Sequence, residues 1–220
     1  MKKLNQKNLY ISLSFLAAFI LWTVLVQSFQ VKDIGPLGSS VGFAPINKFI
    51  HNLTGVNMSL YTITDWLGLV PIVFAFGFTL LGLVQWIKRK KLLKVEGSIL
   101  ILGVFYIITI AVYILFEIYT VNYRPILING YLETSYPSST TLLSMCVMPT
   151  AIMQLSSRIK NKPLRYSVVF LLAAFTVFMV IGRIVSGVHW ISDIIGGALL
   201  SAGLVMLYRY FVGVVENKPL

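Results

Sequence analysis

The sequence predicts an all-α, polytopic membrane protein. Of the 220 residues 57% are hydrophobic, and only 11% are charged. The hydrophobic residues come in blocks of about 20, the length of helix that crosses a hydrocarbon core about 30 Å thick. Lys and Arg gather in the short polar segments between these blocks. Together these observations argue against a water-soluble globular domain.

Six blocks are long enough to be transmembrane helices. Their approximate bounds are 9–28, 66–87, 98–119, 139–155, 166–185 and 191–214. The first block is long for the hydrophobic part of a signal peptide, and no clear small-residue cleavage site follows it, so we interpret it as a retained helix. Because we find neither an internal repeat nor a linker, we predict one transmembrane domain over residues 1–220.

The basic residues predict how the spans are oriented, because Lys and Arg accumulate in cytoplasmic loops. With the N-terminus inside, the inside segments hold 14 of the 18 basic residues. The outside segments hold only Lys32, Lys48, Arg124 and Arg183. An even number of spans then places both termini in the cytoplasm. Since topology accounts for the net charge of +11, we expect no nucleic-acid partner.

The longest outside segment, residues 29–65, is rich in Gly, Pro and Asn. Within it, INKFIHNLTG is expected to form a short interfacial helix. We interpret its lone histidine, His51, as a surface residue. The single cysteine, Cys146, excludes an internal disulfide.

Six ionisable residues lie within or next to the predicted spans, all towards the outer face. Charges in lipid are unfavourable, so such residues are candidates for function. They are Asp65, Glu117, Arg124, Arg183, His189 and Asp193.

The segment GRIVSGVHWISD, residues 182–193, contains three of these candidates. His189 and Asp193 are four residues apart and would share one face of a helix. If the carboxylate accepted the N–H of one ring nitrogen, the other nitrogen would be free as a nucleophile or base. The alternative is a structural His–Asp pair, with Arg183 reaching to the membrane interface.

Two further segments carry groups that bind anions. In NYRP, Arg124 precedes a proline, which gives a rigid turn with one fixed cation. In SYPSSTT four hydroxyl residues follow one another, and Ser138 is a candidate N-cap of the fourth span, where free N–H groups favour an anion. The alternatives are an ordinary interfacial arginine and an ordinary helix cap.

In order and spacing these segments resemble the motifs of the type 2 phosphatidic acid phosphatase and haloperoxidase superfamily, in its membrane lipid phosphatase branch. The family motifs are K-x6-R-P, P-S-G-H and S-R-x5-H-x3-D. The third motif is matched by Arg183, His189 and Asp193, with Gly182 in place of its serine. The resemblance covers about residues 117–193.

The first two motifs are altered. Arg124 and Pro125 match the first, but Glu117 stands where the family has lysine. The second keeps its proline and Ser138, whereas Ser139 and Thr140 replace the glycine and the histidine.

The resemblance implies a phosphatase whose His189 attacks phosphorus, forms a phosphohistidine and is oriented by Asp193. It implies that the phosphate oxygens are held by Arg124, Arg183, Ser138, Ser139 and Thr140. Neither a metal nor a cofactor is implied, and the substrates would be membrane lipid phosphates or polyprenyl diphosphates such as undecaprenyl diphosphate. The residue at 140 would have been the general acid; Thr140 does not titrate near neutral pH, so Glu117 is a candidate replacement.

Two other functions stay open. The first is a relative that binds a lipid phosphate or a protein partner with little or no turnover. The second is a transporter or channel, but a conduction path needs polar residues at the membrane midplane, and here they cluster at one end.

The predicted topology can be tested by labelling single cysteines in a Cys146→Ser background with a membrane-impermeant reagent. In intact cells we expect Gly130→Cys to react and Lys160→Cys to stay unlabelled. Labelling at position 160 without labelling at 130 would contradict the predicted orientation.

Overall fold

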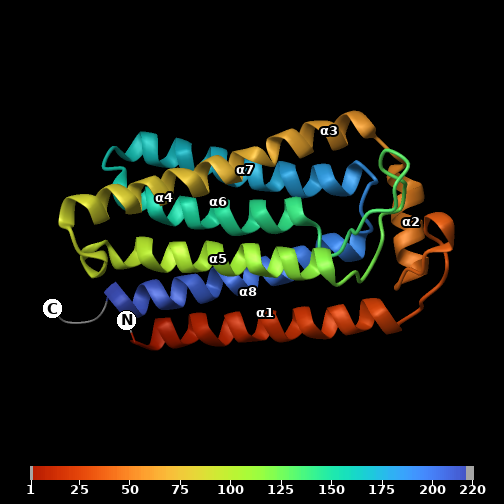
Figure 1. Ribbon diagram of the computed structural model, residues 1–220, viewed down its shortest axis with the longest axis horizontal. Coiled ribbons are helices and arrows are strands. Elements are labelled where there is room, and N and C mark those ends of the chain that lie inside the picture. Colours follow the sequence, from red (N-terminus) through yellow and green to blue (C-terminus); the bar gives the residue numbers. More distant parts are fainter. Residues whose placement is uncertain (1, 217–220) are drawn as a thin grey trace.

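The computed structural model describes residues 2–216, and its long helices run side by side (Figure 1). The α-helices are α1 (Lys2–Ser28), α2 (Ala44–Thr54), α3 (Met58–Leu67), α4 (Leu69–Arg89), α5 (Gly97–Ile118), α6 (Ser139–Arg158), α7 (Lys162–Val185) and α8 (Ile191–Glu216). The short 3-10 helices are η1 (Pro36–Gly38) and η2 (Leu92–Lys94). Extended pairing within residues 2–216 is limited to isolated bridges. The predicted all-α fold is confirmed.

Five segments of the described chain are long and apolar enough to cross a membrane. They are Asn5–Ser28, Met58–Arg89, Gly97–Ile118, Lys162–Val185 and Ile191–Glu216. Each contains most of one predicted span, so the chain is a multi-pass membrane protein. The remaining predicted span, 139–155, corresponds to α6, which is more polar. Because α4, α5, α7 and α8 all pack against α6, it need not present an apolar surface to lipid, and the count of six spans stays a prediction.

Residues 58–65, expected to lie in the outer loop, instead belong to α3, which leads directly into α4. The helix starts at Asn57, whose side-chain oxygen accepts a hydrogen bond from the Leu60 N–H at 2.9 Å. Residues 44–54 form α2, the short helix expected from INKFIHNLTG.

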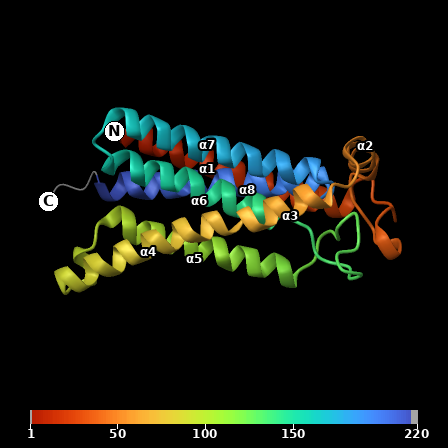
Figure 2. The same cartoon turned by 90° about the horizontal axis from the view of Figure 1, so that it is seen from above.

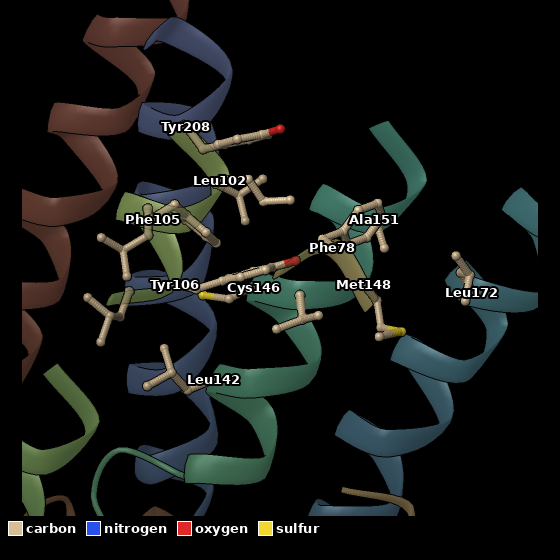
Figure 3. Packing of buried hydrophobic residues seen from close by; sticks show 14 of the residues in the cluster. Phe78, Leu102, Phe105, Tyr106, Leu142, Cys146, Met148, Ala151, Leu172 and Tyr208 are labelled. Atoms are coloured by element: carbon tan, nitrogen blue, oxygen red, sulfur yellow. The ribbon is translucent and has the colours of Figure 1, made fainter. Parts of the chain in front are cut away.

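The hydrophobic core lies where α5, α6 and α8 meet (Figure 3). Figure 3 shows Tyr106 beside Cys146, and the ring of Phe105 packs against those of Tyr106 and Tyr208. On its other side α8 packs against α1, and Gly203 allows the close approach: a Cβ there would lie 2.7 Å from Leu16 Cδ2. These contacts fix the helices whose ends carry the candidate site.

The two ends of the bundle differ. Figure 1 shows the start of α1, the end of α8, and the connections α4–α5 and α6–α7 at one end. At the other end, which we call the site end, lie α2, segment 119–138 and segment 186–190. Most of the basic residues belong to the first end, as the topology requires, although Lys218 lies outside the described residues. Which end faces the cytoplasm stays a prediction.

Candidate active site

The carboxylate of Asp193 ties three segments together at the site end. Asp193 is fully buried in the first turn of α8. Its Oδ1 accepts a hydrogen bond from Asn122 Nδ2 at 3.0 Å, and its Oδ2 accepts from Ser135 Oγ at 2.8 Å and from the Trp190 N–H at 3.0 Å. A buried carboxylate needs such donors, so these bonds hold segments 119–138 and 186–190 against α8.

His189 lies in segment 186–190, just before α8 begins at Ile191. The prediction that His189 and Asp193 share one helix is therefore wrong, although the two side chains do approach each other. His189 Nδ1 lies 3.8 Å from Asp193 Oδ2, too far for the expected hydrogen bond. Ser135 and Trp190 already donate to that oxygen. Catalytic hydrogen bonds are often long before substrate binds.

The other ring nitrogen of His189 faces a cation. Arg124 Nη1 lies 3.2 Å from His189 Nε2. Because a guanidinium can only donate, Nε2 must be the acceptor, and the proton of the neutral ring sits on Nδ1, facing Asp193. Burial, reinforced by the charge of Arg124, lowers the pKa of His189 to about 4. The imidazole is therefore neutral at pH 7.

Arg124 is fixed by Glu133, a residue of the same segment. Its Nε lies 3.0 Å from Glu133 Oε2, an ion pair without hydrogen-bond alignment. Its backbone N–H donates to the Glu133 carbonyl at 3.0 Å, next to a bridge between Tyr123 and Thr134. The guanidinium is thus held at the mouth of the site, with Nη1 directed at His189.

Arg183, near the end of α7, is 1% exposed. Its Nη2 donates to Asp65 Oδ1 at 2.8 Å and to the Thr140 hydroxyl, and its Nη1 donates to the Tyr61 carbonyl at 3.5 Å. The arginine therefore links α7 to α3 and to the start of α6. The predicted candidates Arg183, Thr140 and Asp65 are brought together in one cluster.

Ser138 occupies the N-cap position of α6, as predicted, but its hydroxyl makes no capping bond. That hydroxyl is buried and has no hydrogen-bond partner among the described residues. A small pocket near this helix start is lined by residues that include Glu117, Arg124, Ser139 and His189, although Ser138 itself does not line it. Free N–H groups at a helix start, an arginine and unpaired hydroxyls suit an oxyanion.

The family model described as the PAP2 superfamily matches residues 117–216. The predicted resemblance to this superfamily is therefore confirmed over these residues, a little under half of the chain. No curated protein matches its sequence significantly.

The PAP2 fold is also seen in a similar solved structure, that of the first transmembrane PAP2 type phosphatidylglycerolphosphate phosphatase from Bacillus subtilis. The TM-score is 0.65 at 17% sequence identity, over 96% of this chain and 98% of that chain. At this identity the likeness establishes the fold.

Two altered positions of the PAP2 motifs have definite contacts here. Glu117, in the last turn of α5, accepts a hydrogen bond from Thr134 Oγ1 at 2.9 Å and lines the pocket that contains Arg124 and His189. Thr140, where the motif has histidine, accepts a hydrogen bond from Arg183. A threonine hydroxyl can hold an arginine in this way but cannot act as a general acid near neutral pH.

Sequence reasoning missed Asn122, Ser135, Tyr61 and Glu133. Asn122 and Ser135 are the first residues of the NYRP and SYPSSTT segments. The need of a buried Asp193 for hydrogen-bond donors was a usable signal that such polar side chains lie near it. His51 was expected at the surface. It is half-buried instead, with its ring 5.5 Å from that of Trp190, and burial lowers its pKa.

Removing the amide donor to Asp193 should destabilise the protein. We expect Asn122→Ala to lower the free energy of unfolding by about 1.5–3 kcal/mol, because a buried carboxylate loses a hydrogen bond. Thermal unfolding in detergent would measure this loss. Asn52→Ala, which replaces an exposed asparagine of α2, is the matched control. Equal stability of the two variants would contradict a structural role for the amide.

The lowered pKa of His189 can be measured directly, because the chain has only two histidines. In a His51→Gln background, NMR of the remaining imidazole should show a neutral ring from pH 8 down to about pH 5, consistent with a pKa of about 4. Adding Arg124→Gln should raise the midpoint, since a repelling charge is removed. A midpoint near the ordinary value of about 6.5 would contradict the burial argument.

Proposed function

We propose that this protein is an integral membrane lipid phosphatase that acts best on lipid diphosphates, with its site at the extracytoplasmic face. The observation that carries the proposal is the placement of neutral His189 between Arg124 and Asp193. The imidazole has a lone pair on Nε2 directed at a cation, and its Nδ1–H faces a carboxylate. This is the arrangement that a nitrogen nucleophile for phosphorus requires.

The proposed reaction has two steps. His189 Nε2 attacks phosphorus, and the bond to the leaving oxygen breaks, giving a phosphohistidine. Water then attacks phosphorus, the P–N bond breaks, and inorganic phosphate leaves. Asp193 stabilises the positive charge that develops on the ring, and Arg124 turns from Nε2 to a phosphate oxygen when substrate enters.

The Ser138 hydroxyl and the first N–H groups of α6 would hold further oxygens of the phosphate. The hydroxyls of Ser139 and Thr140 lie in the same turn. Arg183, which donates a hydrogen bond to the Thr140 hydroxyl, would bind the phosphate beside Thr140 or stabilise it through that hydroxyl. A charge-assisted hydrogen bond of this kind contributes about 1.5–3 kcal/mol.

An apolar groove supports a lipid substrate. Figure 2 shows α4 and α5 as a pair on one side of the bundle. Between them lies a groove lined by Ile72, Ala75, Tyr106, Ile110 and Tyr113 among others. Tyr113 also lines the pocket of the site, so groove and site adjoin.

A second apolar hollow adjoins this groove along α5. Tyr106 lines both, and the second hollow reaches Ile99. From Tyr113 to Ile99 the helix rises about 21 Å. The groove and the second hollow together therefore offer a long apolar path for the tail of a substrate whose phosphate sits at His189.

The leaving group decides which lipid is favoured. Thr140 cannot donate a proton, and its hydroxyl is engaged by Arg183. A lipid alcohol is about as weak an acid as water, so it would have to leave as a strongly basic alkoxide. A diphosphate expels a phosphate monoester whose second pKa is about 6, which can leave unprotonated. Loss of a general acid should lower the rate about 10²–10⁴-fold on monoesters and far less on diphosphates.

We therefore expect the purified protein to release phosphate faster from a polyprenyl diphosphate, such as undecaprenyl diphosphate, than from phosphatidic acid. Thr140→His should raise monoester cleavage more than diphosphate cleavage. Both substrates are assayed on one preparation, with His189→Ala as the inactive control and Glu117→Gln as the test of a substitute acid. Equal or faster cleavage of the monoester by the unmodified protein would contradict the leaving-group argument.

A second candidate is a protein that binds a lipid phosphate, or a protein partner, with little or no turnover. The altered positions favour it, because Glu117 replaces a cation and Thr140 replaces the acid. A folded protein that binds orthovanadate but cleaves neither substrate would support this second function.

A further inference from the structure

We propose that Tyr61 of α3 is a positioning residue that holds the two site arginines beside one aromatic ring, and that Gly182 gives α3 the room to do so. This inference deepens the proposed function and rests on it. Tyr61 lies outside the region that matches the PAP2 superfamily, residues 117–216.

The ring of Tyr61 contacts both cations. Arg183 Cζ lies 4.9 Å from the ring centroid, and Arg124 Cζ lies 5.8 Å from it. Both distances are within the range of about 6 Å in which a guanidinium is attracted to an aromatic face. Two like charges that converge on one phosphate repel each other, and the negative face of the ring offsets part of that repulsion. The carbonyl of Tyr61 also accepts the bond from Arg183 Nη1.

The other anchors of the two arginines are separate. Arg124 is held by Glu133 within segment 119–138, whereas Arg183 is held by Asp65 and Thr140. In the described part of the chain, Tyr61 is the contact that the two guanidiniums share. Its ring is therefore placed to fix their separation, which must match the spacing of two phosphate oxygens.

Helix α3 reaches the arginines because α7 carries glycine at 182. A Cβ at that position would lie 2.7 Å from Thr64 Cγ2, closer than such atoms approach. Thr64 is fully buried, and its hydroxyl donates to the carbonyls of Leu60 and Tyr61, which fixes the position of its methyl group. The family motif has serine here, and a serine would push α3 away from α7. Asp65, one turn after Tyr61, shares its helix face and its partner Arg183.

The start of α3 is fixed as well. The Asn57 N–H donates to the Ser186 carbonyl at 3.0 Å. Gly187, with a φ of +66°, packs directly on Gly55, and a Cβ there would lie 1.8 Å from the Gly55 oxygen. Segment 186–190, which carries His189, and helix α3 are therefore joined independently of the ring contact.

The test measures binding of inorganic orthovanadate to the purified, detergent-solubilised protein by calorimetry. We expect Tyr61→Leu to weaken binding about tenfold, because attraction to both cations is lost, and Tyr61→Phe to stay within about twofold. Tyr166→Leu is the matched control, since it removes a similar contact with Arg165 (5.6 Å) on α7, far from the site. Unchanged affinity in Tyr61→Leu, or an equal loss in Tyr61→Phe, would overturn the proposal.

A second set of variants tests the role of Gly182. Gly182→Ala should weaken orthovanadate binding about as much as Tyr61→Leu, and should add little to it when the two are combined. Thr64→Ser removes the Cγ2 that the new Cβ would meet, so the double variant Gly182→Ala/Thr64→Ser should regain most of the affinity. Thermal unfolding, measured in parallel, separates a displaced helix from an unfolded protein. Full affinity in Gly182→Ala would overturn the role of the glycine.

Orthovanadate binding needs no turnover, so the two proposals can fail separately. If Tyr61→Leu binds weakly but the unmodified protein cleaves no lipid, the positioning role stands and the phosphatase does not. If cleavage depends on His189 while Tyr61→Leu keeps its orthovanadate affinity and its kcat/KM, only the positioning role fails. An unmodified protein that binds neither orthovanadate nor phosphate would overturn both.

Discussion

The arrangement of the site end depends on the need of one buried carboxylate for hydrogen-bond donors. A carboxylate removed from water is strongly unfavourable unless donors surround it. Asp193 receives donors from segment 119–138 and from the backbone just before α8. The neighbouring residue, Ser192, is joined to α2 in a similar way. Its hydroxyl accepts a hydrogen bond from Asn47 Nδ2 at 3.0 Å. The start of α8 is thus the point at which otherwise separate loops are joined, and the direction in which His189 points follows from it.

The positive charges of the site are not free in the structure. Arg124 is paired with Glu133 at 3.0 Å, and Arg183 is paired with Asp65 at 2.8 Å. Both carboxylates are substantially exposed, at 40% and 59% of their side chains, whereas the arginines are mostly buried. An entering anion would therefore meet fixed cations and carboxylates that can turn towards water. This combination keeps the arginines ordered before substrate arrives.

The sequence predicted those parts of the protein whose signals are local. Each lipid-facing helix must be apolar along its length, so the spans could be read directly, whereas α6 is enclosed by other helices and carries a weaker signal. Arg183, His189 and Asp193 lie in one short segment. A buried aspartate signals a need for donors, but the sequence does not show which residues supply them. Asn122, Ser135 and Tyr61 were missed because their partners lie 71, 58 and 122 residues away. That His189 precedes α8 had a readable cause: Asp193 accepts the N–H of Trp190, as the third helical residue does in a capping box.

The groove between α4 and α5 has a consequence for how such a protein meets its substrate. A hollow on the flank of the bundle opens towards the surrounding lipid, so a long-tailed molecule could slide in sideways without leaving the bilayer. The quantity that sets occupancy is then the mole fraction of that lipid in its leaflet, and its solubility in water is irrelevant. A lipid that is scarce in the cell as a whole would still be abundant to this protein wherever it is confined to the same leaflet.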